Sequence, residues 1–231
     1  MKILAFNASP RKGQGVTDVL MNTFLESATS AGAEVEKYYV VDLDVKGCLG
    51  CFSCWWKTPG RCVHRDDMDW ILPKMVEADA VVFGTPVYHY NIVHHLQRLR
   101  ERTLPLNKPE MYIQGGETHH PGRHERKSPQ RTVVISVCGF PDLTNFNQVE
   151  GLFPDAVKIL LPSSGIIYDE EGRGYIESFF RAIRDAGKEL TVDGDVSEET
   201  RRKLIVDYPE EVKKMIVEKY NIWSSQATPG T

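Results

Sequence analysis

Residues 3–17 have the sequence ILAFNASPRKGQGVT and combine three signals that set the architecture of the chain. The first four residues are uniformly apolar, which is typical of a short strand buried on both faces of a parallel sheet. The polar residues that follow are rich in glycine, proline and serine and indicate a turn. An apolar face at helical spacing then begins at Val19 and continues through Leu20 and Phe24. The sequence therefore predicts a strand, a loop and a helix in succession.

Further apolar runs continue this alternation along the chain. Residues 35–41, 80–84, 132–137 and 165–168 each predict a strand, with helical patterns between them. The clearest helical pattern begins at Met68, directly after two aspartates that can cap a helix. Five short strands alternating with helices predict an α/β fold, a three-layer sandwich around a five-stranded parallel sheet. The number of strands favours the flavodoxin-like order 2-1-3-4-5.

The chain of 231 residues is long enough for one large domain with an appendage. We expect residues 1–195 to form the flavodoxin-like domain and residues 196–231 to form extra C-terminal helices outside the sheet. Two segments of the domain do not fit its core. Residues 47–62 hold most of the cysteines, and residues 114–130 form a polar loop that is long for a connection within a domain. We expect the long loop to have a functional or oligomer-forming role.

Charge and hydropathy exclude several classes of protein. The chain has 28 Lys+Arg against 32 Asp+Glu, a net charge of −4, so no basic surplus favours a nucleic-acid partner. No apolar run approaches the roughly 18 residues that a membrane span needs. The residues after Lys2 contain no secretory apolar region. We therefore expect a cytoplasmic protein without a membrane or nucleic-acid partner.

The loop of residues 9–17 lies where a parallel sheet binds ligands, between the carboxyl end of the first strand and the start of the first helix. Its N–H groups, the hydroxyls of Ser9 and Thr17 and the Arg11 guanidinium would hold a terminal phosphate. The loop matches neither the Gly-x-Gly-x-x-Gly pattern nor a Walker loop, which favours a monophosphate over a dinucleotide bridge. The alternative is that its glycines only form a tight turn.

Two more loops are expected at the same edge of the sheet. Residues 85–91 follow the third strand, and Pro86 and Tyr88 offer a flat apolar wall for a planar ring. The alternative is a turn with surface aromatic residues. After the fourth strand, Gly139 allows a close approach of the backbone. Three such loops on one edge indicate a ligand site more strongly than any one of them.

Four of the five cysteines fall within residues 48–62, in the pattern C-x2-C-x2-C-x7-C. An odd number of cysteines in a chain expected in the cytoplasm argues against a disulfide framework. Three thiols at short spacing and a fourth on a longer arm can surround a cubane cluster. Structural zinc and metal-free thiols are the alternatives. We expect Cys138 to be a small core residue and assign no side chain a role as catalytic acid or base.

These features together resemble the NADPH-dependent FMN reductase family of flavodoxin-like proteins, and more narrowly its iron-sulfur flavoprotein branch. The matching parts are residues 9–17, the cysteine segment with the Asp66-Asp67-Met68 that follows it, residues 85–88 and residues 196–200. The resemblance implies that the FMN phosphate is held by Ser9, Arg11, Gln14, Gly15, Val16 and Thr17. It implies that the isoalloxazine is bordered by Pro86, Val87, Tyr88 and Gly139. It also implies that a [4Fe-4S] cluster is ligated by Cys48, Cys51, Cys54 and Cys62.

The function implied by this resemblance is a redox enzyme that couples the two-electron chemistry of FMN to one-electron transfer through the cluster. NAD(P)H or ferredoxin would be the electron donor, and a small molecule or a ferredoxin-like protein would be the partner. We expect a homodimer or homotetramer. The alternatives are a cluster-free NAD(P)H-dependent FMN or quinone reductase, a non-enzymatic electron carrier, and a mononucleotide-binding module with zinc.

Overall fold

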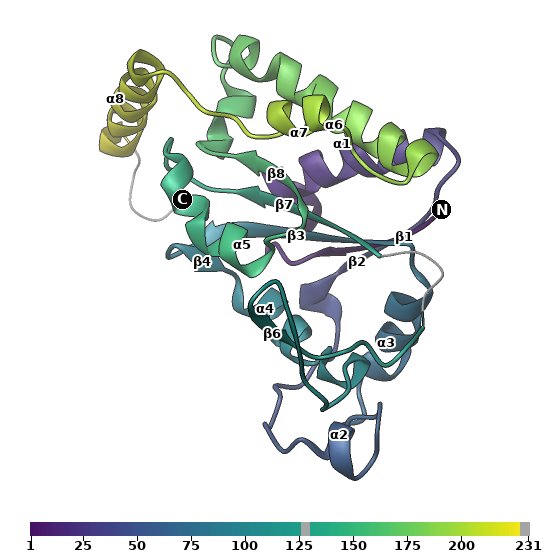
Figure 1. Cartoon of the computed structure of the whole chain (residues 1–231). Coiled ribbons are helices and arrows are strands. Elements are labelled where there is room, and N and C mark those ends of the chain that lie inside the picture. The colour runs from purple at the N-terminus through teal and green to yellow at the C-terminus, as the bar shows by residue number, and fades with distance from the viewer. Residues whose placement is uncertain (126–129, 227–231) are drawn as a thin grey trace.

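The structure is a computed structural model that describes residues 1–125 and 130–226 of the chain. A parallel sheet runs through the centre of the molecule, with helices on both faces (Figure 1). Its parallel strands, in spatial order, are β2 (Glu34–Tyr39), β1 (Lys2–Asn7), β3 (Ala80–Tyr88), β7 (Arg131–Val137) and β8 (Val157–Leu161). The strands β4 (Asn91–Ile92), β5 (Tyr112–Gln114) and β6 (Glu117–His119) are short strands of hairpins. Without them, the order of the parallel strands is the predicted 2-1-3-4-5. The flavodoxin-like fold class is confirmed.

The predicted fifth strand was placed wrongly. Residues 165–168 lie in the 3-10 helix η5 (Ser164–Tyr168), and the edge strand is β8. Both segments are short and apolar, so periodicity does not separate them. The backbone of Ser163 is left-handed, with φ of 46°, and its carbonyl accepts the N–H of Ile166. This turn ends the extended chain before residue 165.

Helices cover the sheet in two layers (Figure 1). One face carries α1 (Val16–Ser30), α6 (Arg173–Asp193) and α7 (Glu198–Lys203), and the other carries α3 (Met68–Glu77), α4 (His94–Glu101) and α5 (Asn147–Leu152). The expected helix after Asp66 is confirmed as α3, and the Met68 N–H donates to Asp66 Oδ1 at 3.2 Å. The last helix is α8 (Glu210–Gln226). In the part of the chain that is described, no helix is long and apolar enough to cross a membrane.

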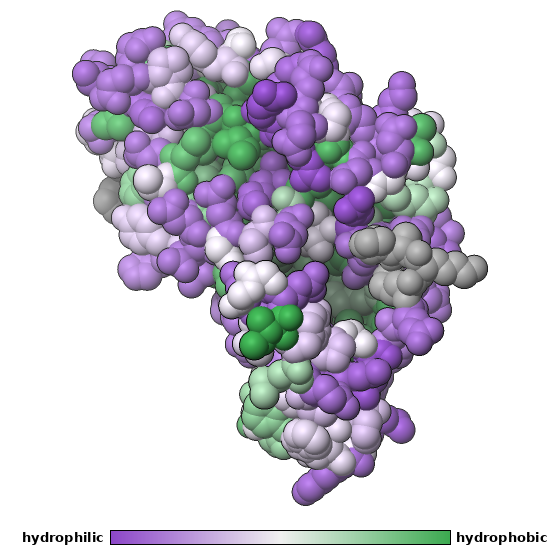
Figure 2. Space-filling model, in the orientation of Figure 1, coloured by the Kyte–Doolittle hydropathy of each residue, from purple (hydrophilic) through white to green (hydrophobic). Residues whose placement is uncertain are grey.

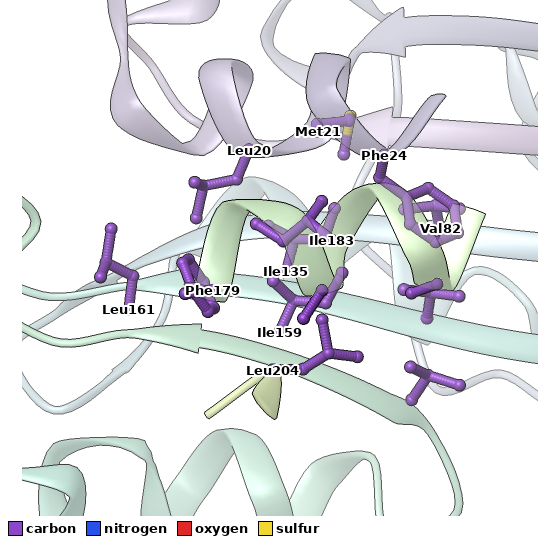
Figure 3. Close-up of a cluster of buried hydrophobic side chains, with 14 of the residues drawn as sticks. Leu20, Met21, Phe24, Val82, Ile135, Ile159, Leu161, Phe179, Ile183 and Leu204 are labelled. Carbon is purple, nitrogen blue, oxygen red and sulfur yellow. The ribbon is translucent and has the colours of Figure 1, made fainter. Parts of the chain in front are cut away.

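The strands divide their side chains between two apolar cores. In β1, Ile3 and Ala5 pack with α1 and α6, whereas Leu4 and Phe6 pack with α3 and α4. This alternation follows from the two-residue period of a strand covered on both faces. Figure 3 shows the first of these cores, in which side chains of α1 and α6 meet those of the central strands.

The two long helices α1 and α6 approach each other closely at one glycine. A Cβ atom on Gly187 would lie 2.4 Å from the carbonyl oxygen of Phe24 and 3.1 Å from the backbone nitrogen of Ala28. Because both of these atoms belong to the backbone of α1, they cannot turn away as a side chain would. The absence of a side chain at Gly187 therefore sets the spacing of this helix pair.

The chain returns to the edge of the sheet after α7. The Leu160 N–H of β8 donates to the Leu204 carbonyl at 2.9 Å, and the Val206 N–H donates to the Leu160 carbonyl at 3.2 Å. Leu204 and Val206 are buried in the same core as α1 and α6. The first of the expected C-terminal helices, α7, follows Ser197, whose side chain accepts the Thr200 N–H at 3.3 Å. The domain boundary expected at residue 195 stays a prediction.

Part of the expected polar loop of residues 114–130 has regular structure. Strands β5 (Tyr112–Gln114) and β6 (Glu117–His119) form an antiparallel hairpin. The hairpin turns at Gly115 and Gly116, whose φ values are 62° and 85°, a backbone region that favours glycine. Residues 126–129 of the predicted loop lie outside the described residues. The expected functional or oligomer-forming role stays a prediction.

Candidate functional site

The connections of the sheet change sides between β1 and β3. The chain leaves β1 for α1 on one face, and it leaves β3 for α4 on the opposite face. In open α/β sheets this reversal leaves a crevice at the carboxyl ends of the strands, where ligands bind. The loop of residues 9–17 opens directly at this position.

The backbone of the loop is held in place from within. The Arg11 N–H donates to Ser9 Oγ at 3.3 Å, and the Lys12 N–H donates to the Ser9 carbonyl at 3.1 Å. A Cβ atom on Gly15 would lie 2.9 Å from Ser9 Oγ, so the glycine lets the start of α1 come close to Ser9. Val16 and Thr17 begin α1, and helix starts present N–H groups without an intrahelical acceptor. The Arg11 side chain is exposed beside them.

A buried polar network lies beneath this loop. Asn7 Oδ1 accepts the Ser9 N–H at 2.9 Å, and Asn7 Nδ2 donates to Asp18 Oδ1 at 2.7 Å. Asp18 also forms an ion pair with Lys37 and accepts a hydrogen bond from Asn22 at 3.0 Å. Asn7 and Asp18 were not predicted as site residues. Asn7 ends the first strand with a polar side chain, and this was the sequence signal that could have identified it.

The loop predicted for residues 85–91 is in fact a continuation of β3. The strand extends to Tyr88, turns at His89 and Tyr90, and returns as β4 (Asn91–Ile92). His89 and Tyr90 have positive φ values of 49° and 63°, as a two-residue hairpin turn requires. Pro86 fits into the strand because β3 pairs with β1 only as far as Gly84, so that side of Pro86 needs no N–H donor.

Aromatic side chains surround the carboxyl ends of β3 and β7. Pro86 is buried, Val87 is half-buried, and Tyr88 and Tyr90 are exposed. The ring of Tyr90 lies 6.4 Å from that of Phe140, which directly follows Gly139. Because β3 and β7 are hydrogen-bonded neighbours in the sheet, the predicted wall residues and Gly139 follow adjacent strands. The roles expected of Pro86, Val87, Tyr88 and Gly139 beside a planar ring stay predictions.

The four clustered cysteines lie around one small pocket. They come from the segment before α2 (Ser53–Trp56), from α2 itself and from the loop that follows. The remaining wall of the pocket includes residues 101, 102, 104 and 105, at the end of α4 and the start of the next turn. All five cysteines of the chain are free thiols, and Cys138 is buried as expected. The thiols that line the pocket are Cys48, Cys51, Cys54 and Cys62.

The thiols influence one another through this pocket. Burial raises the pKa of Cys54, and the charges of Cys62, Cys48 and Cys51 raise it further. The hydroxyl and N–H of Ser53 lower the pKa of Cys51. In residues 1–125 and 130–226, no three His, Cys, Asp or Glu side chains have the arrangement of a metal site. Four thiols facing one pocket nevertheless form the donor set that an iron-sulfur cluster uses.

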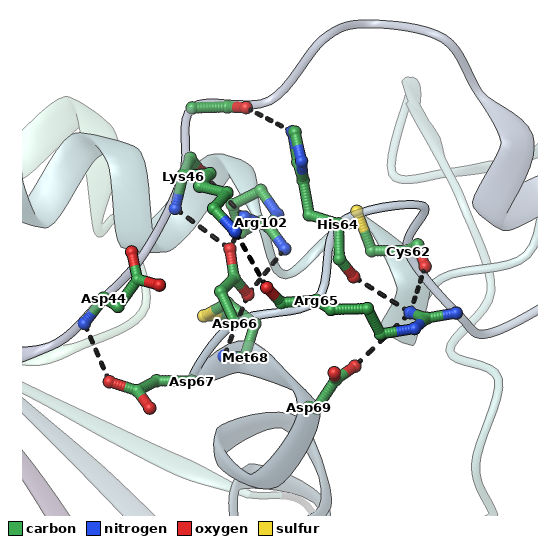
Figure 4. Close-up of polar contacts among 11 residues, drawn as sticks. Asp44, Lys46, Cys62, His64, Arg65, Asp66, Asp67, Met68, Asp69 and Arg102 are labelled. Carbon is green, nitrogen blue, oxygen red and sulfur yellow. Dashed lines mark hydrogen bonds and ion pairs between the residues drawn. The ribbon is translucent and has the colours of Figure 1, made fainter.

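A buried ion pair supports the cysteine segment (Figure 4). Arg102 Nη1 donates to Asp66 Oδ2 at 2.6 Å, and Nη2 donates to Asp66 Oδ1 at 3.0 Å. The side chains of Arg102 and Asp66 are 1% and 0% exposed. Burial alone would raise the pKa of Asp66, but the hydrogen bonds from Arg102 and from the Lys46 and Met68 N–H groups lower it. The pair ties the start of α3 to the end of α4. Sequence reasoning missed Arg102 because its partner is 36 positions away.

The β5–β6 hairpin continues into a segment that packs against the cysteine segment. The ring of His120 lies 4.8 Å from that of Trp55, and Trp55 Nε1 donates to the Leu104 carbonyl at 3.2 Å. Gly60 has a φ of 81° and lies against the Arg123 side chain, where a Cβ atom would be 3.0 Å from Arg123 Cδ. The cysteine segment projects below α3 and α4 in Figure 1, and Figure 2 shows this projection largely in pale shades.

Comparison with known proteins places these features in a family. Residues 1–104 match the family NADPH-dependent FMN reductase. This part of the chain includes the loop of residues 9–17, the cysteine segment and β3. Over residues 1–104, the chain is similar to the NADPH-dependent FMN reductase family. The resemblance seen in the sequence is thereby confirmed.

Several curated relatives carry the name iron-sulfur flavoprotein, the branch that the sequence resembles. An iron-sulfur flavoprotein of Methanocaldococcus jannaschii is 37% identical over 106 residues, which cover 46% of this chain and 53% of the relative. An iron-sulfur flavoprotein of Archaeoglobus fulgidus is 38% identical over 103 residues, covering 45% of this chain and 49% of the relative. An iron-sulfur flavoprotein of Methanosarcina thermophila is 34% identical over 108 residues, covering 47% of this chain and 55% of the relative. The chain thus spans about half the length of the curated relatives it matches.

Solved structures support the fold over a larger part of the chain. An FMN-dependent NADH-azoreductase from Bacillus anthracis, in complex with FMN, has a TM-score of 0.60 at 17% identity and covers 83% of this chain and 100% of its own. An NAD(P)H:quinone oxidoreductase from Methanothermobacter marburgensis has a TM-score of 0.60 at 14% identity, with 82% and 96% covered. At these identities the likeness shows the fold alone.

Proposed function

We propose that the chain is an FMN-dependent oxidoreductase that couples two-electron flavin chemistry to one-electron transfer through a [4Fe-4S] cluster. The observation that carries the flavin part is the loop of residues 9–17 at the point where the connections of the sheet change sides. The family match of residues 1–104 supports this assignment. The cluster is supported by the shared pocket of four thiols and by the names of the curated relatives.

The loop would hold the FMN phosphate by charge and by backbone donors. Arg11 would supply a positive charge, and the N–H groups at the start of α1 would face the phosphate oxygens. Asn7 keeps Ser9 in position through its hydrogen bond to the Ser9 N–H. The residues proposed for the phosphate site are Ser9, Arg11, Gln14, Gly15, Val16 and Thr17.

The ends of β3 and β7 would border the isoalloxazine. FMN supplies hydride and single-electron chemistry when bound, so the protein's task is to bind and orient it. Buried Pro86 would exclude water from one side of the ring site, and half-exposed Tyr88 would offer an aromatic surface near the solvent. We assign no side chain a role as acid or base. The residues proposed for this border are Pro86, Val87, Tyr88 and Gly139.

The cysteine pocket would hold the cluster, whose chemistry is the exchange of single electrons. The thiols of Cys48, Cys51, Cys54 and Cys62 would be its ligands. NAD(P)H or ferredoxin is the proposed donor, and a small molecule or a ferredoxin-like protein is the proposed acceptor. We also propose a homodimer or homotetramer, since Met111 and Ile113 beside and within the β5–β6 hairpin are 71% and 77% exposed.

The first test is anaerobic purification followed by measurement of iron, sulfide and FMN. We expect about four iron and four sulfide per chain beside one FMN, the composition of a [4Fe-4S] flavoprotein. Cys54→Ala should lose iron and retain FMN. Cys138→Ala is the matched control and should retain both, because Cys138 does not line the pocket.

The same measurements separate the alternatives. FMN without iron in the wild-type protein would refute the cluster and favour a cluster-free FMN or quinone reductase. A protein with neither FMN nor iron would refute the flavoprotein assignment. Turnover of NAD(P)H with a quinone is expected of the enzyme, and holoprotein that transfers electrons only to partner proteins would instead be a carrier.

A further inference from the structure

The buried ion pair beside the cysteine pocket leaves one strong donor unused. Arg102 binds Asp66 through both of its terminal nitrogens, and Nη1 also donates to the Lys46 carbonyl at 2.7 Å. Its Nε is buried and has no hydrogen-bond partner. Within the described residues, Arg98 Nε is the one other buried side-chain nitrogen or oxygen in this condition. Buried donors are almost always satisfied, so each exception needs an explanation.

Arg102 differs from Arg98 in what it faces. Arg102 lines the pocket together with the four thiols, whereas Arg98 is not among the lining residues. Burial alone would lower the pKa of Arg102, but the hydrogen bond with Asp66 and the nearby charge of Cys62 raise it. Arg102 and Cys62 both line this pocket, and Figure 4 labels them in one close-up.

We propose that Arg102 sets the reduction potential of the cluster by directing its guanidinium charge and free Nε–H toward the sulfur of Cys62. This inference rests on the proposed function, because it needs a cluster in the pocket. Arg102 acts through the thiolate of Cys62 and is therefore a positioning residue.

The direction of the effect follows from charge. Reduction adds one electron and one negative charge to a site that four thiolates already make anionic, and it moves no proton and breaks no bond. A fixed positive charge and an N–H donor at a ligand sulfur stabilise the more negative state. Of the two residues of the ion pair, Arg102 lines the pocket with the thiols and Asp66 does not, so the pair presents its positive charge to the pocket. Arg102 should therefore raise the potential.

The test is a redox titration of anaerobically purified holoprotein, followed by electron paramagnetic resonance. Arg102→Lys keeps a positive charge for Asp66 but removes the Nε–H. Loss of a hydrogen bond to a charged sulfur should shift the one-electron equilibrium about tenfold toward the oxidised state, which is about 59 mV. The FMN potential should not change. Arg100→Lys is the matched control, since Arg100 belongs to α4, packs 4.5 Å from the Phe153 ring and does not line the pocket.

Each outcome of this titration decides the matter. A wild-type cluster potential in Arg102→Lys with full iron content would overturn the inference, as would an equal drop in Arg100→Lys. If Arg102→Lys does not retain iron, the double variant Asp66→Asn/Arg102→Leu, which leaves no buried charge unpaired, is titrated instead. A drop of the same sign supports the inference, and an unchanged potential overturns it. Wild-type protein without iron would refute the proposed cluster itself, before any substitution is compared.

Discussion

Replacing Gly187 by alanine should destabilise the protein, because the new methyl group has no space. It would lie 2.4 Å from the carbonyl oxygen of Phe24 and 3.1 Å from the backbone nitrogen of Ala28. Neither atom can move without a shift of α1, so α1 and α6 must separate. Overpacking of this kind typically costs about 1–3 kcal/mol.

The helix propensity of alanine offsets part of that cost. Alanine is better than glycine within a helix by about 1 kcal/mol, and Gly187 lies in the interior of α6. Because the closest atoms belong to the backbone of α1, the overpacking cost should lie in the upper part of this range, at about 2–3 kcal/mol. We therefore expect a net loss of about 1–2 kcal/mol in the free energy of unfolding. At about 2–4 °C per kcal/mol for a chain of this size, Tm should fall by about 2–8 °C.

Gly174→Ala is the matched control in the same helix. A Cβ atom on Gly174 would meet nothing within 4 Å, so only the propensity gain of up to about 1 kcal/mol remains. Both variants are compared with the wild type by urea unfolding followed by far-ultraviolet circular dichroism. FMN is kept at one concentration, because bound ligand adds stability. The reasoning is refuted if Gly187→Ala is as stable as the wild type, or if both substitutions shift stability by the same amount.

Three further predictions concern charge and thiol reactivity. Arg11→Ala should weaken FMN binding about tenfold, as measured by flavin fluorescence. Lys12→Ala should weaken it less, because Lys12 already pairs with Asp42. Equal effects of the two substitutions would argue against Arg11 as a phosphate ligand. The lowered pKa of Asp66 gives stability that is present above about pH 4 and is lost as pH falls through the folded pKa. The urea midpoint of Asp66→Asn should therefore fall less steeply with decreasing pH than that of the wild type, and an equally steep fall would contradict this. Burial raises the pKa of Cys138 to about 11, so iodoacetamide at about pH 8 should spare Cys138 and alkylate exposed Cys51 in metal-free protein; mass spectrometry showing equal rates would contradict it.

The central architecture followed from local patterns in the sequence. The strands β1, β3 and β7 are short apolar runs because both faces of the sheet are covered, and this covering is what makes such runs recognisable. The start of α3 was equally clear, since Asp66 accepts the Met68 N–H and apolar residues follow at helical spacing. Patterns of this kind depend only on residues that are close in sequence, so one amino-acid sequence is enough to predict these elements.

Other features depend on contacts between distant segments. The apolar residues 165–168 became a 3-10 helix because Ser163 turns the backbone, which no periodicity reports. The third strand was expected to end at residue 84, but β3 continues through Pro86, which is tolerated because β1 no longer pairs with the strand there. The partnership of Arg102 with Asp66 likewise needs the end of α4 to meet the start of α3. The spacing of the four cysteines predicted their common site, but the spacing of residues in the sequence could not predict that Arg102 lines the same pocket.

The backbone pairing of Leu160 with residues 204–206 also protects the molecule from its own copies. Strand β8 is at the edge of the sheet, and its sequence VKILL is apolar, free of proline and carries one charge. An open edge of this composition is a template for strand addition and fibrillar aggregation. The returning segment pairs with both the N–H and the carbonyl of Leu160, the fourth of the five residues of that strand. A segment that has no part in the proposed chemistry therefore limits aggregation by covering this edge. A chain that ends before Leu204 would leave the backbone groups of Leu160 open to pairing with another copy.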